Sequence, residues 1–77
     1  MKLEIISPEK ILFSGEVELV TLPGSLGSFT ILPGHAAIIS SLEKGKLVYR
    51  TSEKDTEINI ESGFAEGKQD RITVCIE

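Results

Sequence analysis

The chain of 77 residues is long enough for one domain, residues 1–77, and its formal net charge is −4 at pH 7. This negative balance removes the electrostatic attraction to phosphate on which nucleic-acid affinity depends, so we expect no nucleic-acid partner. One cysteine excludes an internal disulfide, and one cysteine with one histidine is a poor donor set for structural zinc. No apolar run approaches the roughly 20 residues of a membrane span. We therefore expect no metal, no cofactor and no direct membrane insertion.

Strand-forming residues dominate the chain, with ten isoleucines, four valines and five threonines. Residues 16–22, EVELVTL, start with Val17 and Leu19 on one face and then change phase, so that Val20 and Leu22 are apolar. A β-bulge near Leu19 and Val20, or a strand buried on both faces, would explain the change of phase.

Two Pro-Gly pairs bracket the next predicted strand, residues 28–32. Pro23–Gly24 and Pro33–Gly34 each suit a type II turn, in which the glycine takes a positive φ. The turns would expose the loop 24–27 and the corner 33–35, and rigid loops of this kind commonly carry binding residues.

The remaining segments also predict strands and turns. Residues 36–43 are short and β-branched at their centre, which favours a strand. Residues 42–47 and 65–72 read as hairpin connections with glycine at a positive φ. Residues 56–61 and 71–76 alternate strictly between apolar and polar positions, which indicates half-buried strands. The sequence therefore predicts an all-β domain, a small two-sheet β-sandwich or flattened barrel of short strands.

Catalytic motifs are weak. His35 follows seven residues after Ser28, but a nucleophilic serine would also need a carboxylate partner and oxyanion donors. The Gly-x-Ser-x-Gly elbow is absent, and so is the glycine spacing of a phosphate loop. We interpret the chain as non-catalytic, with two alternatives left open: a small hydrolase that uses His35 and Ser28, and a free-standing β-sandwich that binds a small ligand or carbohydrate.

Residues 22–47, LPGSLGSFTILPGHAAIISSLEKGKL, resemble the N-terminal β-sandwich of the ATP synthase F1 epsilon subunit. The flanking segments LEIISPEKILFSGEVELV and INIESGFAEGKQDRITV are similar to that family as well. The sequence departs from the family pattern at three positions. Ser28 stands where the family often has an acidic residue, Thr30 where it has glycine, and Ala37 where it has proline.

The resemblance implies a non-catalytic central-stalk (rotor) subunit of an F-type ATP synthase. Such a subunit links the gamma subunit to the membrane c-ring and supports the coupling of ion flow to ATP synthesis. The implied c-ring contacts are Ser28, Pro33, Gly34 and His35, and the implied gamma contacts are Ser7 and Ser40.

The implied location is the cytoplasmic face of the inner (plasma) membrane, as a peripheral subunit of the complex. Because the chain stops after its last predicted strand, we expect a naturally short form without the helical C-terminal hairpin of many epsilon subunits. A minimal sandwich without a disulfide or metal gains stability by burying a face on a partner. We therefore expect Val20, Leu22 or Phe29 to contribute to an exposed apolar patch.

Overall fold

A computed structural model describes residues 1–34 and 37–77, and that part of the chain forms nine β-strands and no helix. The all-β prediction is confirmed. Within the described ranges, no helix has the length and hydropathy needed to cross a membrane. The strands are β1 (Lys2–Ile6), β2 (Ile11–Glu16), β3 (Leu19–Gly24), β4 (Gly27–Ile31), β5 (Ile38–Leu42), β6 (Gly45–Arg50), β7 (Asp55–Ile60), β8 (Gly63–Lys68) and β9 (Arg71–Ile76).

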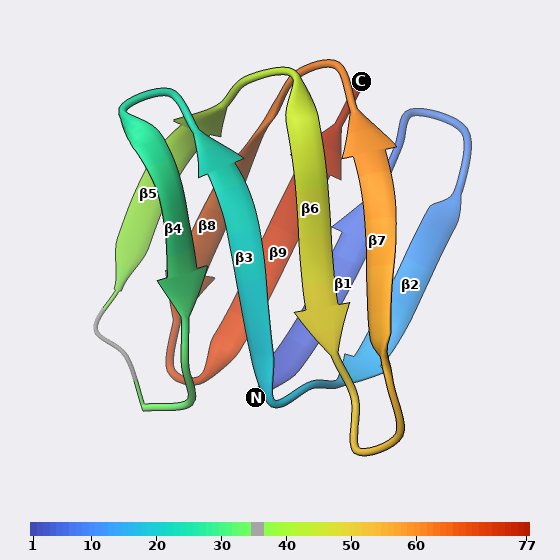
Figure 1. Ribbon diagram of the computed structural model, residues 1–77, viewed down its shortest axis with the longest axis vertical. Coiled ribbons are helices and arrows are strands. Elements are labelled where there is room, and N and C mark those ends of the chain that lie inside the picture. The colour runs from blue at the N-terminus through green and yellow to red at the C-terminus, as the bar shows by residue number, and fades with distance from the viewer. Residues whose placement is uncertain (35–36) are drawn as a thin grey trace.

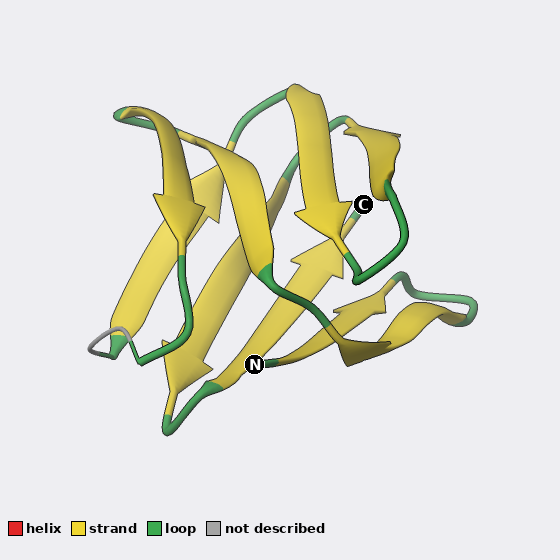
Figure 2. Ribbon diagram, turned by 60° about the horizontal axis from the view of Figure 1, so that its bottom comes forward, coloured by secondary structure: helices red, strands yellow, loops and turns green. Residues whose placement is uncertain are grey.

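The strands form one curled sheet in the order β2-β1-β9-β8-β5-β3-β6-β7, with β4 paired beside β3. The sheet folds over itself into two layers (Figures 1 and 2). The front layer contains β4, β3, β6 and β7, and the back layer contains β5, β8, β9, β1 and β2 (Figure 1). The two layers join where Gly24 of β3 pairs with Leu42 of β5. The sandwich prediction is confirmed in the form of this curled sheet.

The hydrophobic core lies between the two layers. Alternation along each strand turns one set of side chains inward, as in β9, where Ile72, Val74 and Ile76 are buried. The largest fully buried side chains are Leu3, Ile5, Leu22, Leu47, Val20 and Val74. The rings of Phe13 on β2 and Tyr49 on β6 stack across the layers with centroids 4.2 Å apart.

The expected contribution to an exposed apolar patch is wrong for Val20 and Leu22, because both side chains are completely buried. Val20 pairs with Ile31 and Leu22 pairs with Phe29 across β3 and β4, on the face that covers the core. Phe29 is half-buried and packs against the same core. These residues stabilise the fold itself.

Residues 16–22 do not form one bulged strand. The strand β2 ends at Glu16 in the back layer, and β3 begins at Leu19 in the front layer (Figure 1). Val17 is buried between them, and its N–H donates to the carbonyl oxygen of Met1 at 2.8 Å. The change of apolar phase therefore marks the passage of the chain from one layer to the other.

The Pro23–Gly24 prediction is wrong, because both residues belong to β3. The turn is made by Ser25 and Leu26, and Gly27 after them has a φ of +127°. Gly24 is needed for packing, since a Cβ there would lie 2.7 Å from the ring of Phe29. The corner at Pro33–Gly34 does have the predicted positive φ, which is +84° at Gly34.

The two predicted hairpins have different outcomes. Residues 42–47 connect β5 in the back layer to β6 in the front layer, so they form no hairpin, and Gly45 has no positive φ. Residues 65–72 do form the β8–β9 hairpin. Its positive φ values belong to Gln69 (+53°) and Asp70 (+62°), the two central residues of a type I′ turn, and Gly67 lies within β8. The strand predicted over residues 36–43 is found as Ile38–Leu42.

An ion pair at the start of the β6–β7 connection predicts an acid-sensitive contribution to stability. Arg50 Nε donates to Asp55 Oδ1 at 2.7 Å. This hydrogen bond, and then the charge of Arg50, lowers the pKa of Asp55 below its ordinary value of 3.8. The folded-state pKa is depressed, so the contribution is present above the unfolded-state pKa and is lost as the pH falls through the folded-state value.

The free energy of unfolding, measured by urea titration, should fall as the pH is lowered from about 7 to about 3. We expect this fall to be smaller in Asp55→Asn than in the wild-type chain. Glu53→Asn, in the adjoining loop, is the control and should keep the wild-type pH dependence. Equal pH dependence in Asp55→Asn and the wild-type chain would contradict the prediction.

Candidate functional site

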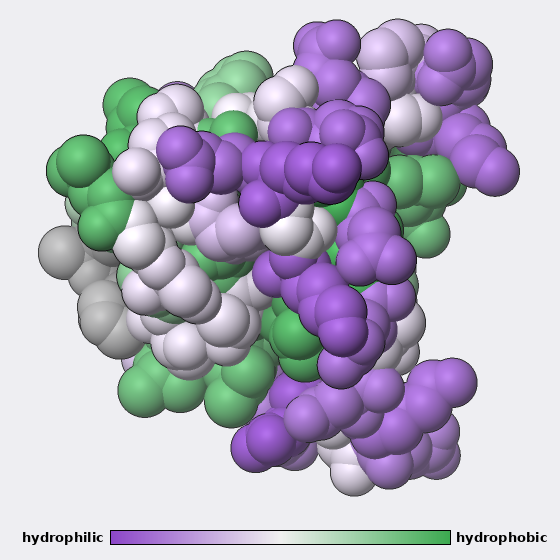
Figure 3. All heavy atoms as spheres, turned by 45° about the horizontal axis from the view of Figure 1, so that its top comes forward, coloured by the Kyte–Doolittle hydropathy of each residue, from purple (hydrophilic) through white to green (hydrophobic). Residues whose placement is uncertain are grey.

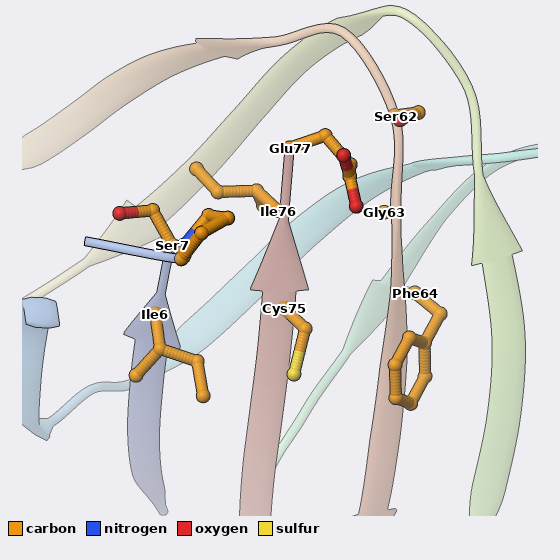
Figure 4. A pocket seen from close by; sticks show the side chains of 9 residues that line it. Ile6, Ser7, Ser62, Gly63, Phe64, Cys75, Ile76 and Glu77 are labelled. Carbon is orange, nitrogen blue, oxygen red and sulfur yellow. The ribbon is translucent and has the colours of Figure 1, made fainter. Parts of the chain in front are cut away.

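The outer face of the back layer has a hollow of about 520 Å³ lined by apolar side chains from three adjacent strands. Ile6 of β1 is in register with Cys75 of β9, and Cys75 is in register with Phe64 of β8. Figure 4 shows these three residues side by side, with Ser7 at the end of β1. Phe64 is 48% exposed and therefore offers an aromatic surface to a partner. We call Ile6, Cys75 and Phe64 the apolar row.

Two bands of charge follow the apolar row along the same outer face. The next row of paired residues holds Glu4, Thr73 and Glu66, and it ends at Ile39 on β5, which is 79% exposed. The row beyond it is basic. That row consists of Lys2, Arg71 and Lys68, each paired with the next. Along the direction of β1, β9 and β8, the outer face thus changes from apolar to acidic to basic.

A second hollow, of about 530 Å³, lies between the β3–β4 hairpin and β5. The two layers separate here. The Gly24–Leu42 pair joins β3 to β5, and the hairpin partner of β3 is β4. Ser28 and Ser40 both line the hollow. The hydroxyls of Ser25 and Ser41 are hydrogen bonded at its edge, with 2.8 Å between the oxygens. Figure 3 shows hydrophobic and neutral residues on this side of the molecule and mostly hydrophilic ones over β6 and β7.

The Pro33–Gly34 corner lies beyond the other end of β4 (Figure 1). The N–H of Gly34 donates to Oδ1 of Asp70 at 3.2 Å. The amino group of Met1 lies 3.7 Å from Oδ2 of Asp70 and 3.0 Å from Oε1 of Glu16. The hydrogen bond to Glu16, with a smaller effect of the Asp70 charge, raises the pKa of the Met1 amino group above its ordinary value of 8.0. An acidic pair therefore holds the first residue beside the corner.

The structure distributes the sequence-predicted contacts over three places. Ser7 lines the apolar hollow of the back layer, whereas Ser28 and Ser40 line the second hollow together. Pro33 stands five residues after Ser28 along an extended chain, a distance of roughly 16 Å. The other predicted c-ring contact, His35, lies outside the described residues. The two predicted gamma contacts are thus in different hollows, and the two parts of the predicted c-ring contact are at opposite ends of β4.

The apolar row and Asp70 were not predicted from the sequence. Strict alternation in β8 could have placed Phe64 opposite the buried Ala65, and the same alternation placed Cys75 opposite Val74. Neither pattern reveals that β1, β9 and β8 are neighbours. No group of three His, Cys, Asp or Glu side chains that could hold a metal ion occurs in the part of the chain that the structure describes.

Sequence comparison matches residues 1–77 with the family "ATP synthase, Delta/Epsilon chain, beta-sandwich domain". The chain belongs to this family. The ATP synthase epsilon chain of Leptospira borgpetersenii serovar Hardjo-bovis (strain JB197) is 43% identical over 77 residues. That match covers 100% of this chain and 61% of the relative. The epsilon chain of Geobacter sulfurreducens is 36% identical over 77 residues, which are 56% of its length. The chain thus spans about three fifths of these relatives.

Chains in two solved structures have the same fold as this chain. A chain in the Tetrahymena thermophila mitochondrial ATP synthase central stalk/c-ring structure superposes with a TM-score of 0.84 at 13% identity. The match covers 97% of this chain and 61% of that one. A chain in the Euglena gracilis mitochondrial ATP synthase OSCP/F1/c-ring structure gives a TM-score of 0.89 at 21% identity, covering 96% and 48%. At these identities the likeness shows a common fold and nothing further.

Proposed function

We propose that this Delta/Epsilon-family domain is a non-catalytic rotor component of an F-type ATP synthase, which joins the gamma subunit of the central stalk to the c-ring. The family match over residues 1–77 carries the proposal. The relatives named ATP synthase epsilon chain and the neighbour from a central stalk/c-ring assembly support it. The role is mechanical, since gamma, this domain and the ring must turn as one body to couple ion flow to ATP synthesis.

The proposed gamma-facing surface is the outer face of the back layer. The apolar row offers an exposed aromatic ring beside a hollow, which is the composition of a well-packed interface centre. The acidic and basic bands beside it supply polar contacts that fix orientation more than they add affinity. Ser7 lies at the rim of this surface and remains a proposed gamma contact. Ser40 remains a proposed gamma contact at the separate serine-lined hollow.

The proposed c-ring contacts are Ser28 and the corner formed by Pro33, Gly34 and His35. Ser28 would offer a hydroxyl where the family often has a carboxylate, so a charge-assisted contact is replaced by a weaker neutral hydrogen bond. The whole assembly would lie on the cytoplasmic face of the inner (plasma) membrane, with this chain held there as a peripheral subunit.

Native co-purification tests the proposal. A tagged copy of the chain, expressed in its own organism and isolated from gently solubilised membranes, is expected to bring down a gamma-type subunit and the c-ring in fixed proportion. An unrelated tagged β-sandwich of similar charge is the control. A chain recovered without either partner under these conditions would contradict a rotor role.

A ligand-binding β-sandwich is the second candidate function. The observation in its favour is the hollow of about 530 Å³, which is lined by serine hydroxyls and by Phe29. In that case the chain would bind a small polar ligand in the absence of any stalk protein. Ser28→Ala would weaken such binding, whereas Phe64→Ser, on the other hollow, would leave it unchanged.

A further inference from the structure

Asp70 has an unusual position, because three segments far apart in the sequence meet at this residue. Its backbone carbonyl oxygen accepts the N–H of Lys2 at 3.0 Å, which attaches the start of β1. Its carboxylate accepts the N–H of Gly34 at 3.2 Å and lies 3.7 Å from the Met1 amino group. One side chain thus contacts both the chain's first residue and the corner that follows β4.

The direction of this carboxylate is fixed by the β8–β9 turn. Asp70 is the second central residue of the turn and has a φ of +62°, a conformation that asparagine and aspartate adopt more readily than most other residues. Backbone pairing of Lys68 with Arg71 closes the turn on both sides. Asp70 therefore approaches the corner from a tight two-residue hairpin turn.

The corner itself depends on contacts made by its backbone. Gly34 has a φ of +84°, and a Cβ at this position would meet nothing within 4 Å. Glycine is therefore required here by backbone conformation and not by crowding, and glycine is the residue that loses the most conformational freedom on ordering. A hydrogen bond from its N–H to a carboxylate is the kind of contact that holds one conformation of such a residue.

We propose that Asp70 is the positioning residue of the Pro33–Gly34 corner, holding its backbone in the orientation in which it meets the c-ring. The ring-facing part of the inference rests on the proposed rotor function, while the holding contact does not. The Met1 amino group, which Glu16 also contacts, is the charged partner that orients the Asp70 carboxylate toward Gly34. The neighbouring basic residues are Lys2, which follows Met1 and begins β1, and Arg71, which follows Asp70 and begins β9.

Two glycine substitutions in the same turn separate this role from an effect on the turn itself. Asp70→Gly keeps the positive φ and removes the carboxylate, and Gln69→Gly changes the adjoining positive-φ position with Asp70 intact. NMR measures the exchange of the Gly34 amide with water in the 77-residue chain. We expect exchange roughly three- to tenfold faster in Asp70→Gly, and within about twofold of wild type in Gln69→Gly.

A third variant and a second measurement complete the test. Asp70→Asn keeps an acceptor oxygen in a residue that tolerates this φ, so it should restore most of the Gly34 protection. The affinity of each variant for a solubilised gamma–c-ring assembly is the second measurement. Variants with faster exchange of the Gly34 amide should bind more weakly, with a roughly three- to tenfold loss of affinity for Asp70→Gly. Equal thermal midpoints for the two glycine variants would show that global stability does not cause the difference.

Each outcome bears on a different part of the inference. Equal Gly34 exchange in Asp70→Gly and Gln69→Gly would overturn the holding contact, whatever the domain binds. Faster exchange with unchanged ring affinity would overturn the positioning role. If the wild-type chain itself fails to bind the assembly, the rotor function fails, and the exchange comparison still decides whether Asp70 holds the corner.

Discussion

Leu22→Ala is expected to lower the free energy of unfolding by about 2 to 5 kcal/mol, the usual cost of deleting a fully buried leucine side chain. Leu22 has no exposed surface and lies on the inner face of β3, opposite Phe29 of β4. A domain of this size has a total stability of only about 4 to 12 kcal/mol. A large part of the variant population would therefore unfold well below the wild-type midpoint in a urea titration followed by circular dichroism.

Leu26→Ala is the matched control, since it deletes the same atoms from a neighbouring leucine. Leu26 is in the turn between β3 and β4 and is fully exposed. Its replacement should change the free energy of unfolding by less than about 0.5 kcal/mol. Similar losses in the two variants would mean that Leu22 does not belong to the core.

Phe64→Ser is expected to weaken binding of the chain to a gamma subunit by roughly 30-fold or more, the effect of removing a central aromatic contact from an interface. Phe64 is the largest member of the apolar row and about half of it is exposed, so its outward ring is free to contact a partner. Titration calorimetry with purified gamma subunit measures the affinity, and the urea midpoint shows whether the fold is retained.

Val48→Ser supplies the control for that experiment. Val48 is half-buried on β6 and pairs with Thr21 and Glu57 on the outer face of the front layer, away from the apolar row. Its replacement should leave the affinity for gamma unchanged. A greater loss of affinity in Val48→Ser than in Phe64→Ser would assign the gamma contact to the front layer.

Local patterns predicted those parts of the fold in which one strand faces one core. The alternation of residues 56–61 and 71–76 matches β7 and β9 because burial on a single face produces a period of two. The same reasoning failed between Val17 and Leu19, where the chain changes layers and the buried face changes with it. It failed for Gly24 and Gly45 as well. Phe29 and Pro23 approach these two glycines closely, and such tertiary contacts leave no local signal.

The candidate site could be predicted less completely than the fold. The resemblance to the epsilon family pointed to Ser7, Ser28 and the Pro33–Gly34 corner, because the family match is carried by local motifs. The apolar row depends on the neighbourhood of the first strand, the last strand and β8. The contact between Gly34 and Asp70 joins residues 36 positions apart. Long-range pairing of this kind is a property of the topology, and no spacing in the sequence encodes it.

The parallel pairing of β1 with β9 has a consequence for how the domain is synthesised. Lys2–Ile6 can form this ladder only after residues 71–75 have left the ribosome, because each residue of the first strand pairs with one of the last. The back layer therefore cannot be completed before residues 71–75 have been synthesised, and until then Leu3 and Ile5, which are fully buried in the folded domain, lack the contacts of β9. Contacts between residues so distant in sequence also slow folding. A ribosome-bound chaperone is thus expected to matter more for this domain than its length alone would suggest.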